Sequence, residues 1–164
     1  MHFLKITMAL VISLLFLTSC SRNHEFYDFE SKENVLSWGV VGADLIGKEK
    51  LLHNTVVRSS PYNLLIWFGS DNFMEGTIHI SKLKLTNTKT QMVVFEYGKI
   101  IEKQIQKDVN SYTAYFSFKN LKLEYDKMVL QIEFLLKQGD KTTKHKAEIF
   151  FEKDYNKFRN IISH

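Results

Sequence analysis

The sequence predicts an all-β domain, most simply an antiparallel β-sandwich, and three observations support this fold class. Aromatic residues are frequent, with 13 Phe and 7 Tyr in 164 residues, and such side chains suit the half-buried surface of a strand. Several segments alternate apolar and polar residues with a period of two. Helix patterns are scarce, so the sequence lacks the helical crossovers that a parallel sheet requires.

The first half of the chain contains five segments with strand signals, at residues 35–41, 51–57, 64–68, 78–85 and 92–97. The run 64–68 is apolar throughout, which is typical of a central strand that is covered on both faces. In the segment 78–85 the apolar residues change parity, which predicts a bulge or turn near Ser81 and Lys82.

The second half repeats these signals. Residues 99–106 can extend as a further strand, and clean alternation covers the segments 112–118, 130–136 and 147–151. The turn signal at residues 138–141 joins the last two of these into a hairpin.

The end of the chain carries the one clear helix signal. Tyr155, Phe158 and Ile162 share a helix face, and Asp154 can cap the first turn, so we expect a short C-terminal helix over residues 154–162.

One residue bears on the type of sandwich. Tyr125 lies just before the strand that starts near Met128, a position reminiscent of the tyrosine corner of immunoglobulin-like domains. The sequence therefore leaves an immunoglobulin-like arrangement open, although a plain surface tyrosine is the favoured alternative. The chain contains no repeat and no Pro/Gly/Ser-rich linker, so we expect one domain over residues 26–164.

The N-terminus has the features of a secretory signal. Lys5 supplies a positive charge, and an apolar run of 12 residues follows at positions 6–17. This run is shorter than the ~20 residues that a bilayer-spanning helix needs. We therefore expect residues 1–19 to be a removable leader.

The leader ends in Leu17, Thr18, Ser19 and Cys20, and this segment resembles the lipobox of bacterial lipoproteins. The resemblance implies diacylglyceryl transfer to the Cys20 sulfur, cleavage before Cys20 and acylation of the new amino terminus. Cys20 is the only cysteine, so an internal disulfide is excluded. The alternative is an ordinary signal peptide that leaves Cys20 as a free thiol. Ser21 resembles the class sorted to the outer membrane, which implies a lipoprotein that faces the periplasm.

Residues 20–25 are expected to form a short tether between the lipidated cysteine and the domain. The five residues after Cys20 reach at most ~17 Å when extended. The domain is therefore expected to work close to its membrane.

Charge and motifs argue against several function classes. The chain has 22 basic and 18 acidic residues, and without Lys5 the balance is 21 against 18, which is too small an excess to indicate nucleic acid. Motifs for a catalytic serine, a nucleotide phosphate or a zinc ion do not occur. We therefore expect a protein that is not an enzyme and has no cofactor and no metal site.

Two surface features are candidates for recognition. The four lysines Lys137, Lys141, Lys144 and Lys146 surround the last predicted hairpin and form a candidate interaction surface, although lysines on a hairpin more often prevent edge-to-edge aggregation. Trp67 and Phe68 precede the loop 69–72 and could be exposed there, but core packing is the favoured position for both.

These observations together predict a membrane-anchored, non-enzymatic protein-binding module of the cell envelope. An immunity protein against an incoming toxin and an accessory subunit of an envelope or secretion complex are two forms of such a module. The alternative is a carrier of lipid or another small ligand, and a hydrolase is the least favoured interpretation.

Overall fold

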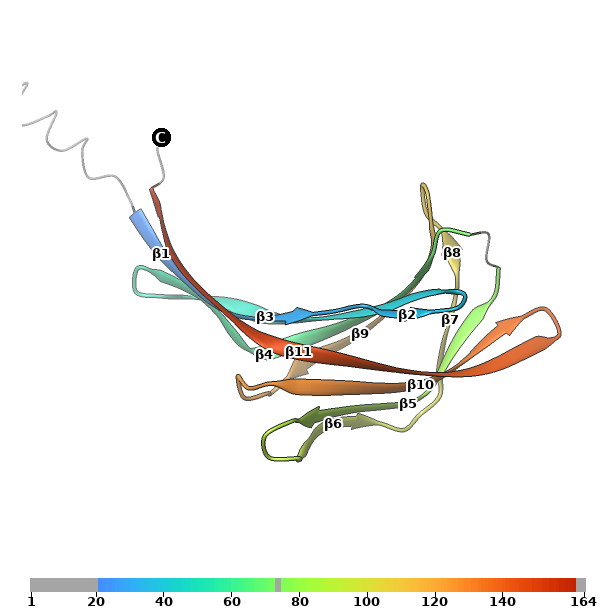
Figure 1. The fold of residues 1–164 in the computed structure, drawn as a ribbon. Helices are drawn as coiled ribbons and strands as arrows, with labels where there is room; N and C mark the ends of the chain where they lie inside the picture. The colour runs from blue at the N-terminus through green and yellow to red at the C-terminus, as the bar shows by residue number, and fades with distance from the viewer. Residues whose placement is uncertain (1–20, 73–74, 162–164) are drawn as a thin grey trace, which may run out of the picture.

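The computed structural model describes residues 21–72 and 75–161, and within these ranges the chain forms strands and turns but no helix (Figure 1). The prediction of an all-β fold is therefore confirmed. In chain order the strands are β1 (Ser21–Ser31), β2 (Asn34–Leu36), β3 (Gly39–Leu52), β4 (Thr55–Ser70), β5 (Thr77–Asn87), β6 (Val93–Tyr97), β7 (Ile101–Gln104), β8 (Gln106–Lys107), β9 (Tyr112–Leu121), β10 (Met128–Gln138) and β11 (Lys141–Ile161).

The strands lie in two layers that face each other as a β-sandwich (Figure 1). One layer has the order β2-β3-β4-β9-β8, and the other has the order β1-β11-β10-β5, with β6 and β7 both paired to β5. Strand β4 belongs to both layers, because its residues 55–58 pair in parallel with β1 while its residues 62–70 pair with β9.

Alternate residues of the two layers point inward and fill the space between them. Leu64, Ile66 and Phe68 on β4 are fully buried, and so is Phe134 on β10. The rings of Phe68 and Phe134 come from opposite layers, and their centroids lie 4.8 Å apart. Burial of such side chains contributes about 1.5–3 kcal/mol each, so this contact helps to hold the layers together.

Two local features expected from the sequence are confirmed. β10 and β11 form a hairpin in which Gln138 lies opposite Lys141. Ser81 is an extra residue on β5, because its neighbours Ile80 and Lys82 lie opposite two consecutive residues of β10. This is the bulge that the change of parity in β5 predicted.

The predicted C-terminal helix over residues 154–162 is wrong. Residues 154–161 continue β11, and each of them pairs with a residue of β1. The spacing of Tyr155 and Phe158 suits a helix face, but β1 offers a complete ladder of backbone hydrogen bonds, and this long-range pairing overrides the local preference. Ile162 lies outside the described residues.

Residues 51–57, expected as one strand, form a hairpin turn instead. β3 ends at Leu52 and β4 begins at Thr55, with His53 in the left-handed region at φ 55°. Histidine and asparagine tolerate this conformation better than most residues, so the pair His53 and Asn54 can turn the chain. The expected strand over residues 35–41 is likewise divided between β2 and β3.

Four strand segments extend beyond the sandwich on the side where the chain enters β1 (Figure 1). We call them the arm, which consists of residues 48–52 of β3, 55–58 of β4, 21–28 of β1 and 153–161 of β11, in that order across the sheet. Residues 21–25, expected to be a tether, pair with residues 157–161 and are part of this sheet.

The expectation that residues 64–68 are covered on both faces is wrong. Leu64, Ile66 and Phe68 point into the core, but Leu65 and Trp67 have the opposite parity and are only half-buried. Leu65 and Trp67 instead line a hollow on the outer face of the layer.

Tyr125 does not form a tyrosine corner. Its ring contacts the rings of Tyr27 and Phe29 at centroid distances of 5.2 and 5.3 Å. Its buried hydroxyl has no hydrogen-bond partner among the described residues. A tyrosine corner depends on a hydrogen bond from this hydroxyl to the backbone, so Tyr125 gives no support to an immunoglobulin-like arrangement.

Candidate functional site

The four residues of the lipobox-like segment, Leu17, Thr18, Ser19 and Cys20, lie outside the described residues. The described chain begins at Ser21, which opens β1 at the end of the arm. A lipid on Cys20 would thus be attached one residue from the arm. No helix long and apolar enough to cross a bilayer is found in residues 21–72 and 75–161.

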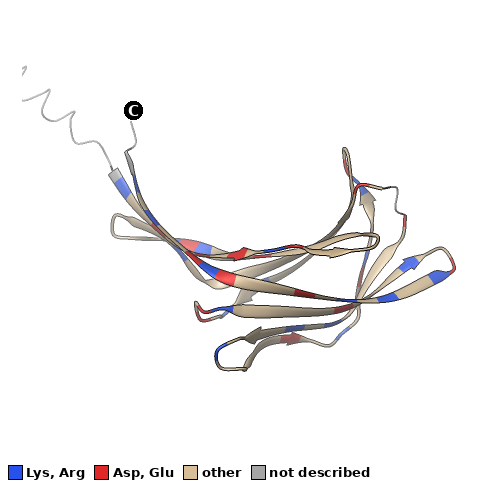
Figure 2. Ribbon diagram, in the orientation of Figure 1, with Lys and Arg blue, Asp and Glu red and all other residues tan. Residues whose placement is uncertain are grey.

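The four lysines of the candidate interaction surface have different surroundings. Lys144 and Lys146 both form ion pairs with Glu133 on the neighbouring strand, at 3.3 and 3.0 Å. The hydrogen bonds from these two lysines lower the pKa of Glu133. Lys137 and Lys141 lie nearer the turn of the hairpin, where Figure 2 shows basic residues on both strands. Glu133 therefore offsets part of the positive charge of this candidate surface.

An aromatic shelf lies on the outer face of β3, β4 and β9. Trp67 on β4 is opposite Gly42 on β3 and opposite Tyr115 on β9, so the three residues form one row across the sheet. The indole lies on Gly42, because a Cβ atom there would be only 2.7 Å from the indole Nε1. Tyr115 is 52% exposed. Gly42 leaves space for the Trp67 ring, which lies against the backbone of β3 beside an exposed tyrosine.

The shelf forms the floor of a hollow of about 620 Å³. The neighbouring rows add Leu65, Val40 and Thr113 to its lining. Three exposed carboxylates, those of Glu33, Asp44 and Asp71, stand around this hollow, whose lining contains no Lys, Arg or His. The hollow is therefore acidic, although the whole chain has a formal net charge of +4.

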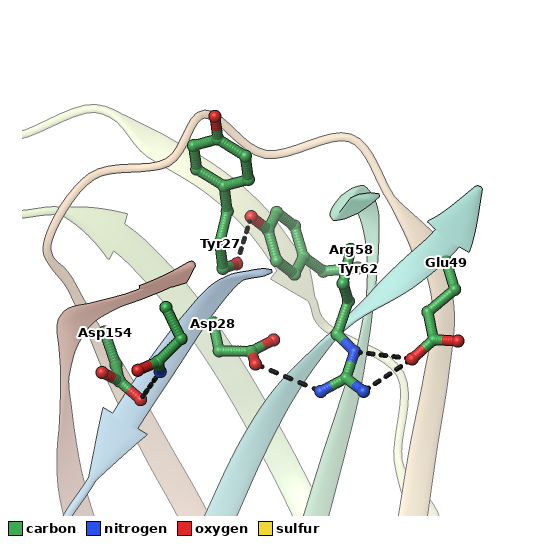
Figure 3. Close-up of polar contacts among 7 residues, drawn as sticks. Tyr27, Asp28, Glu49, Arg58, Tyr62 and Asp154 are labelled. Atoms are coloured by element: carbon green, nitrogen blue, oxygen red, sulfur yellow. Dashed lines mark hydrogen bonds and ion pairs between the residues drawn. The ribbon is translucent and has the colours of Figure 1, made fainter. Parts of the chain in front are cut away.

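A second polar cluster surrounds Arg58 at the base of the arm (Figure 3). The Arg58 guanidinium donates to Asp28 on β1 at 3.1 Å and to Glu49 on β3 at 2.6 and 3.1 Å. It also lies 4.0 Å above the centroid of the Phe26 ring. The hydrogen bond to Glu49 raises the pKa of Arg58, while burial raises the pKa of Asp28 against the opposing influence of Arg58. Arg58 thus joins the three strands β1, β3 and β4.

Two more hydrogen bonds in Figure 3 lie close to this cluster. The Tyr62 hydroxyl donates to the backbone carbonyl of Tyr27 at 2.9 Å, and burial raises the pKa of Tyr62 far above its ordinary value. The Asn156 amide donates to the Asp154 carboxylate at 2.9 Å. Tyr62 therefore acts as a neutral donor that fixes β1 onto the core.

The described residues offer little for metal chemistry. No group of three or more His, Cys, Asp or Glu residues that could hold a metal ion occurs in residues 21–72 and 75–161. His79 instead pairs with Glu102, with 3.1 Å between Nδ1 and Oε2. His145 is half-buried against the Trp38 and Phe134 rings, and burial lowers its pKa.

Sequence reasoning placed Trp67 in the core and so missed the shelf. All five residues of the run 64–68 are apolar, so the sequence of the run does not show which of them point into the core and which point outward. A glycine inside a strand indicates that another group lies close to the backbone. Gly42 identifies Trp67 as that group only when the pairing of β3 with β4 is known.

No family model, no curated protein and no solved structure matches this chain.

Proposed function

We propose that this chain is a lipid-anchored, non-enzymatic binding module of the cell envelope, which holds a protein partner on the aromatic shelf. The observation that carries the proposal is the open, acid-rimmed surface around Trp67 and Tyr115. Trp and Tyr are the residue types that most often dominate the energy of a protein interface. On the shelf they lie side by side on a rigid sheet, so binding would order few side chains.

The charges around the shelf indicate the chemistry of the partner. Glu33, Asp44 and Asp71 would attract a segment that carries Lys or Arg. A guanidinium or ammonium group that enters the hollow also meets the aromatic residues Trp67 and Tyr115, and a cation that stacks on such a ring gains about 0.5–2 kcal/mol. The favoured partner is therefore a protein with a basic segment.

The location follows from the N-terminal segment. The lipobox-like residues would place acyl chains on Cys20, and Ser21 suggests the outer membrane with the domain facing the periplasm. Two or more acyl chains make a stable anchor. A partner at this place would be a component of an envelope or secretion complex, or an incoming toxin that the chain neutralises as an immunity protein.

The alternative of a lipid or small-ligand carrier receives less support. A carrier needs an interior chamber for its ligand. In the described chain the space between the layers is occupied by large buried side chains, among them Tyr62, Phe68, Phe134 and Phe151. The hollow at the shelf lies outside this core.

Photocross-linking in the native envelope tests the proposal. A photoreactive residue at Thr113, beside the shelf, is compared with one at Lys84, on the outer face of the other layer. We expect a specific adduct from position 113 and none from position 84. Mass spectrometry should locate the adduct in a segment of the partner that contains Lys or Arg.

The purified partner then allows a quantitative test. Trp67→Ala is expected to weaken its Kd about 30-fold, the effect of losing roughly 2 kcal/mol at an interface hot spot. Tyr155→Ala is the matched control, because Tyr155 is an aromatic residue with 48% exposure on β11 and does not line the hollow. Equal effects of the two substitutions, or an adduct in an acidic segment, would refute the proposal.

A further inference from the structure

The end of the arm carries exposed apolar side chains beside the point where the chain enters the fold. Leu51 and Leu52, at the turn between β3 and β4, are 58% and 53% exposed. This turn lies next to the beginning of β1, because the Asn23 amide donates to the Asn54 carbonyl at 3.2 Å. The turn and the start of β1 therefore form one end of the molecule.

A third apolar group belongs to the same end. Phe158 on β11 is 42% exposed, and its ring stacks on His24 of β1 with centroids 4.8 Å apart. Val56 of β4 is the other cross-strand neighbour of His24. Apolar side chains thus occur on β3, β4 and β11 at the same level of the arm.

The charged side chains of the described residues nearest the end of the arm are basic. The last acidic residue toward the tip is Glu25, which pairs with Lys157 at 2.6 Å. Beyond that pair, the described residues 21–24, 51–56 and 158–161 include Arg22 and Arg159 and contain no Asp or Glu. Figure 2 shows basic residues at the start of β1 and toward the end of β11. The end of the arm therefore combines exposed leucines with positive charge.

We propose that the end of the arm docks on the anionic headgroup layer of the membrane, with Leu51 and Leu52 inserted among the headgroups. This inference rests on the proposed lipid anchor at Cys20. The Cα atom of Cys20 would lie ~3.8 Å from that of Ser21, and Ser21 is fixed by its pairing with Ile161. Acyl chains on Cys20 would therefore hold this end of the molecule at the bilayer.

A lipid surface fits these residues better than a protein does. Each basic side chain near an anionic bilayer strengthens membrane binding roughly fivefold. Exposed leucines strengthen it further, because their apolar surface leaves water when they enter the boundary between headgroups and acyl chains. The arm would then act as a second membrane contact beside the acyl anchor. It would orient the sandwich and keep the domain from rotating freely about its lipid.

The proposal is tested on the chain without acyl groups. Every described strand begins at or after Ser21, so a chain that starts at residue 20 with Cys20→Ser keeps the whole described fold. Its binding to vesicles of phosphatidylethanolamine and phosphatidylglycerol is compared with its binding to vesicles of phosphatidylcholine alone. We expect sedimentation with the anionic vesicles, weakened by salt, and little with the neutral ones.

Substitutions then locate the contact. The double variant Leu51→Ser/Leu52→Ser should lower the partition coefficient by about tenfold or more. Arg22→Glu should lower it by roughly fivefold or more. Ile100→Ser/Val109→Ser is the matched control, because it removes two apolar residues of 72% and 86% exposure outside the arm, and it should bind as the parent does. Circular dichroism checks that each variant is folded.

Three results would overturn the docking proposal: no binding to anionic vesicles, equal loss in the control variant, or a dimer in solution that the leucine substitutions abolish. The last result would assign the arm to a second copy of the chain. None of these results would change palmitate labelling of the full chain or cross-linking at the shelf. Failure of this inference is therefore distinguishable from failure of the proposed function.

Discussion

The contact between Gly42 and Trp67 makes the shelf sensitive to a single methyl group. A Cβ atom at position 42 would lie 2.7 Å from the indole Nε1 and closer still to Cε2 and Cζ2, whereas ordinary contacts begin at 3.4 Å. The ring must therefore move by about 1 Å in Gly42→Ala, because close-packed atoms cannot overlap. We expect the variant to fold with the Trp67 ring lifted from the sheet.

The cost of this displacement can be bounded. Overpacking usually costs 1–3 kcal/mol, and the half-buried ring can move toward solvent, so we expect about 1–2 kcal/mol of lost stability. In a domain of about 140 residues this lowers the Tm by roughly 3–8 °C. The Kd for a partner on the shelf should weaken by about tenfold, since part of the contact with Trp67 is lost.

Thermal unfolding of four proteins isolates the contact: the parent, Gly42→Ala, Trp67→Ala and the double variant. In the Trp67→Ala background the added methyl meets no indole, so Gly42→Ala should change the stability by less than about 0.5 kcal/mol. Gly98→Ala is the control, because no atom lies within 4 Å of a Cβ at that position. The reasoning fails if Gly42→Ala costs the same with and without Trp67, or behaves like Gly98→Ala.

Two further predictions concern the anchor and the core. Cys20→Ala should abolish palmitate labelling, and persistent labelling would contradict the lipid anchor. Burial lowers the pKa of His145 in the folded protein below its unfolded value of ~6.5. Above the unfolded pKa the contribution of neutral His145 to the unfolding free energy is complete. It is lost as the pH falls through the folded pKa. His145→Phe should therefore flatten the decline in unfolding free energy between about pH 7.5 and 5.5 in urea titrations, and an unchanged slope would contradict this explanation.

Alternation along single strands was enough to predict the sandwich. The period of two in β9 and β10 follows directly from burial of every second residue, for example Ala114 and Phe116. The bulge at Ser81 was predictable for the same reason, because one inserted residue reverses the parity of those that follow. Features of this kind depend only on neighbours along the chain.

The arm and the shelf depend on neighbours across the sheet, and the sequence does not state which strands pair. Tyr155 and Phe158 fit a helix or a strand until β1 is known to lie beside them. Trp67 looks like a core residue until Gly42 is placed opposite it. Both proposed surfaces therefore fell outside what local patterns can predict.

The position of β1 has a consequence for the order in which the protein matures. Ser21 pairs with Ile161, 140 residues later in the chain, and among the described strands the other partner of β1 is β4, through a four-residue parallel contact. Closing so long a loop is slow, and residues 151–161 are synthesised long after β1. If the chain is exported from its N-terminus, β1 can pair with β4 first, and its pairing with β11 has to wait until residues 151–161 have crossed the membrane. The arm is therefore completed late, after the strands that lie between β1 and β11 in the sequence.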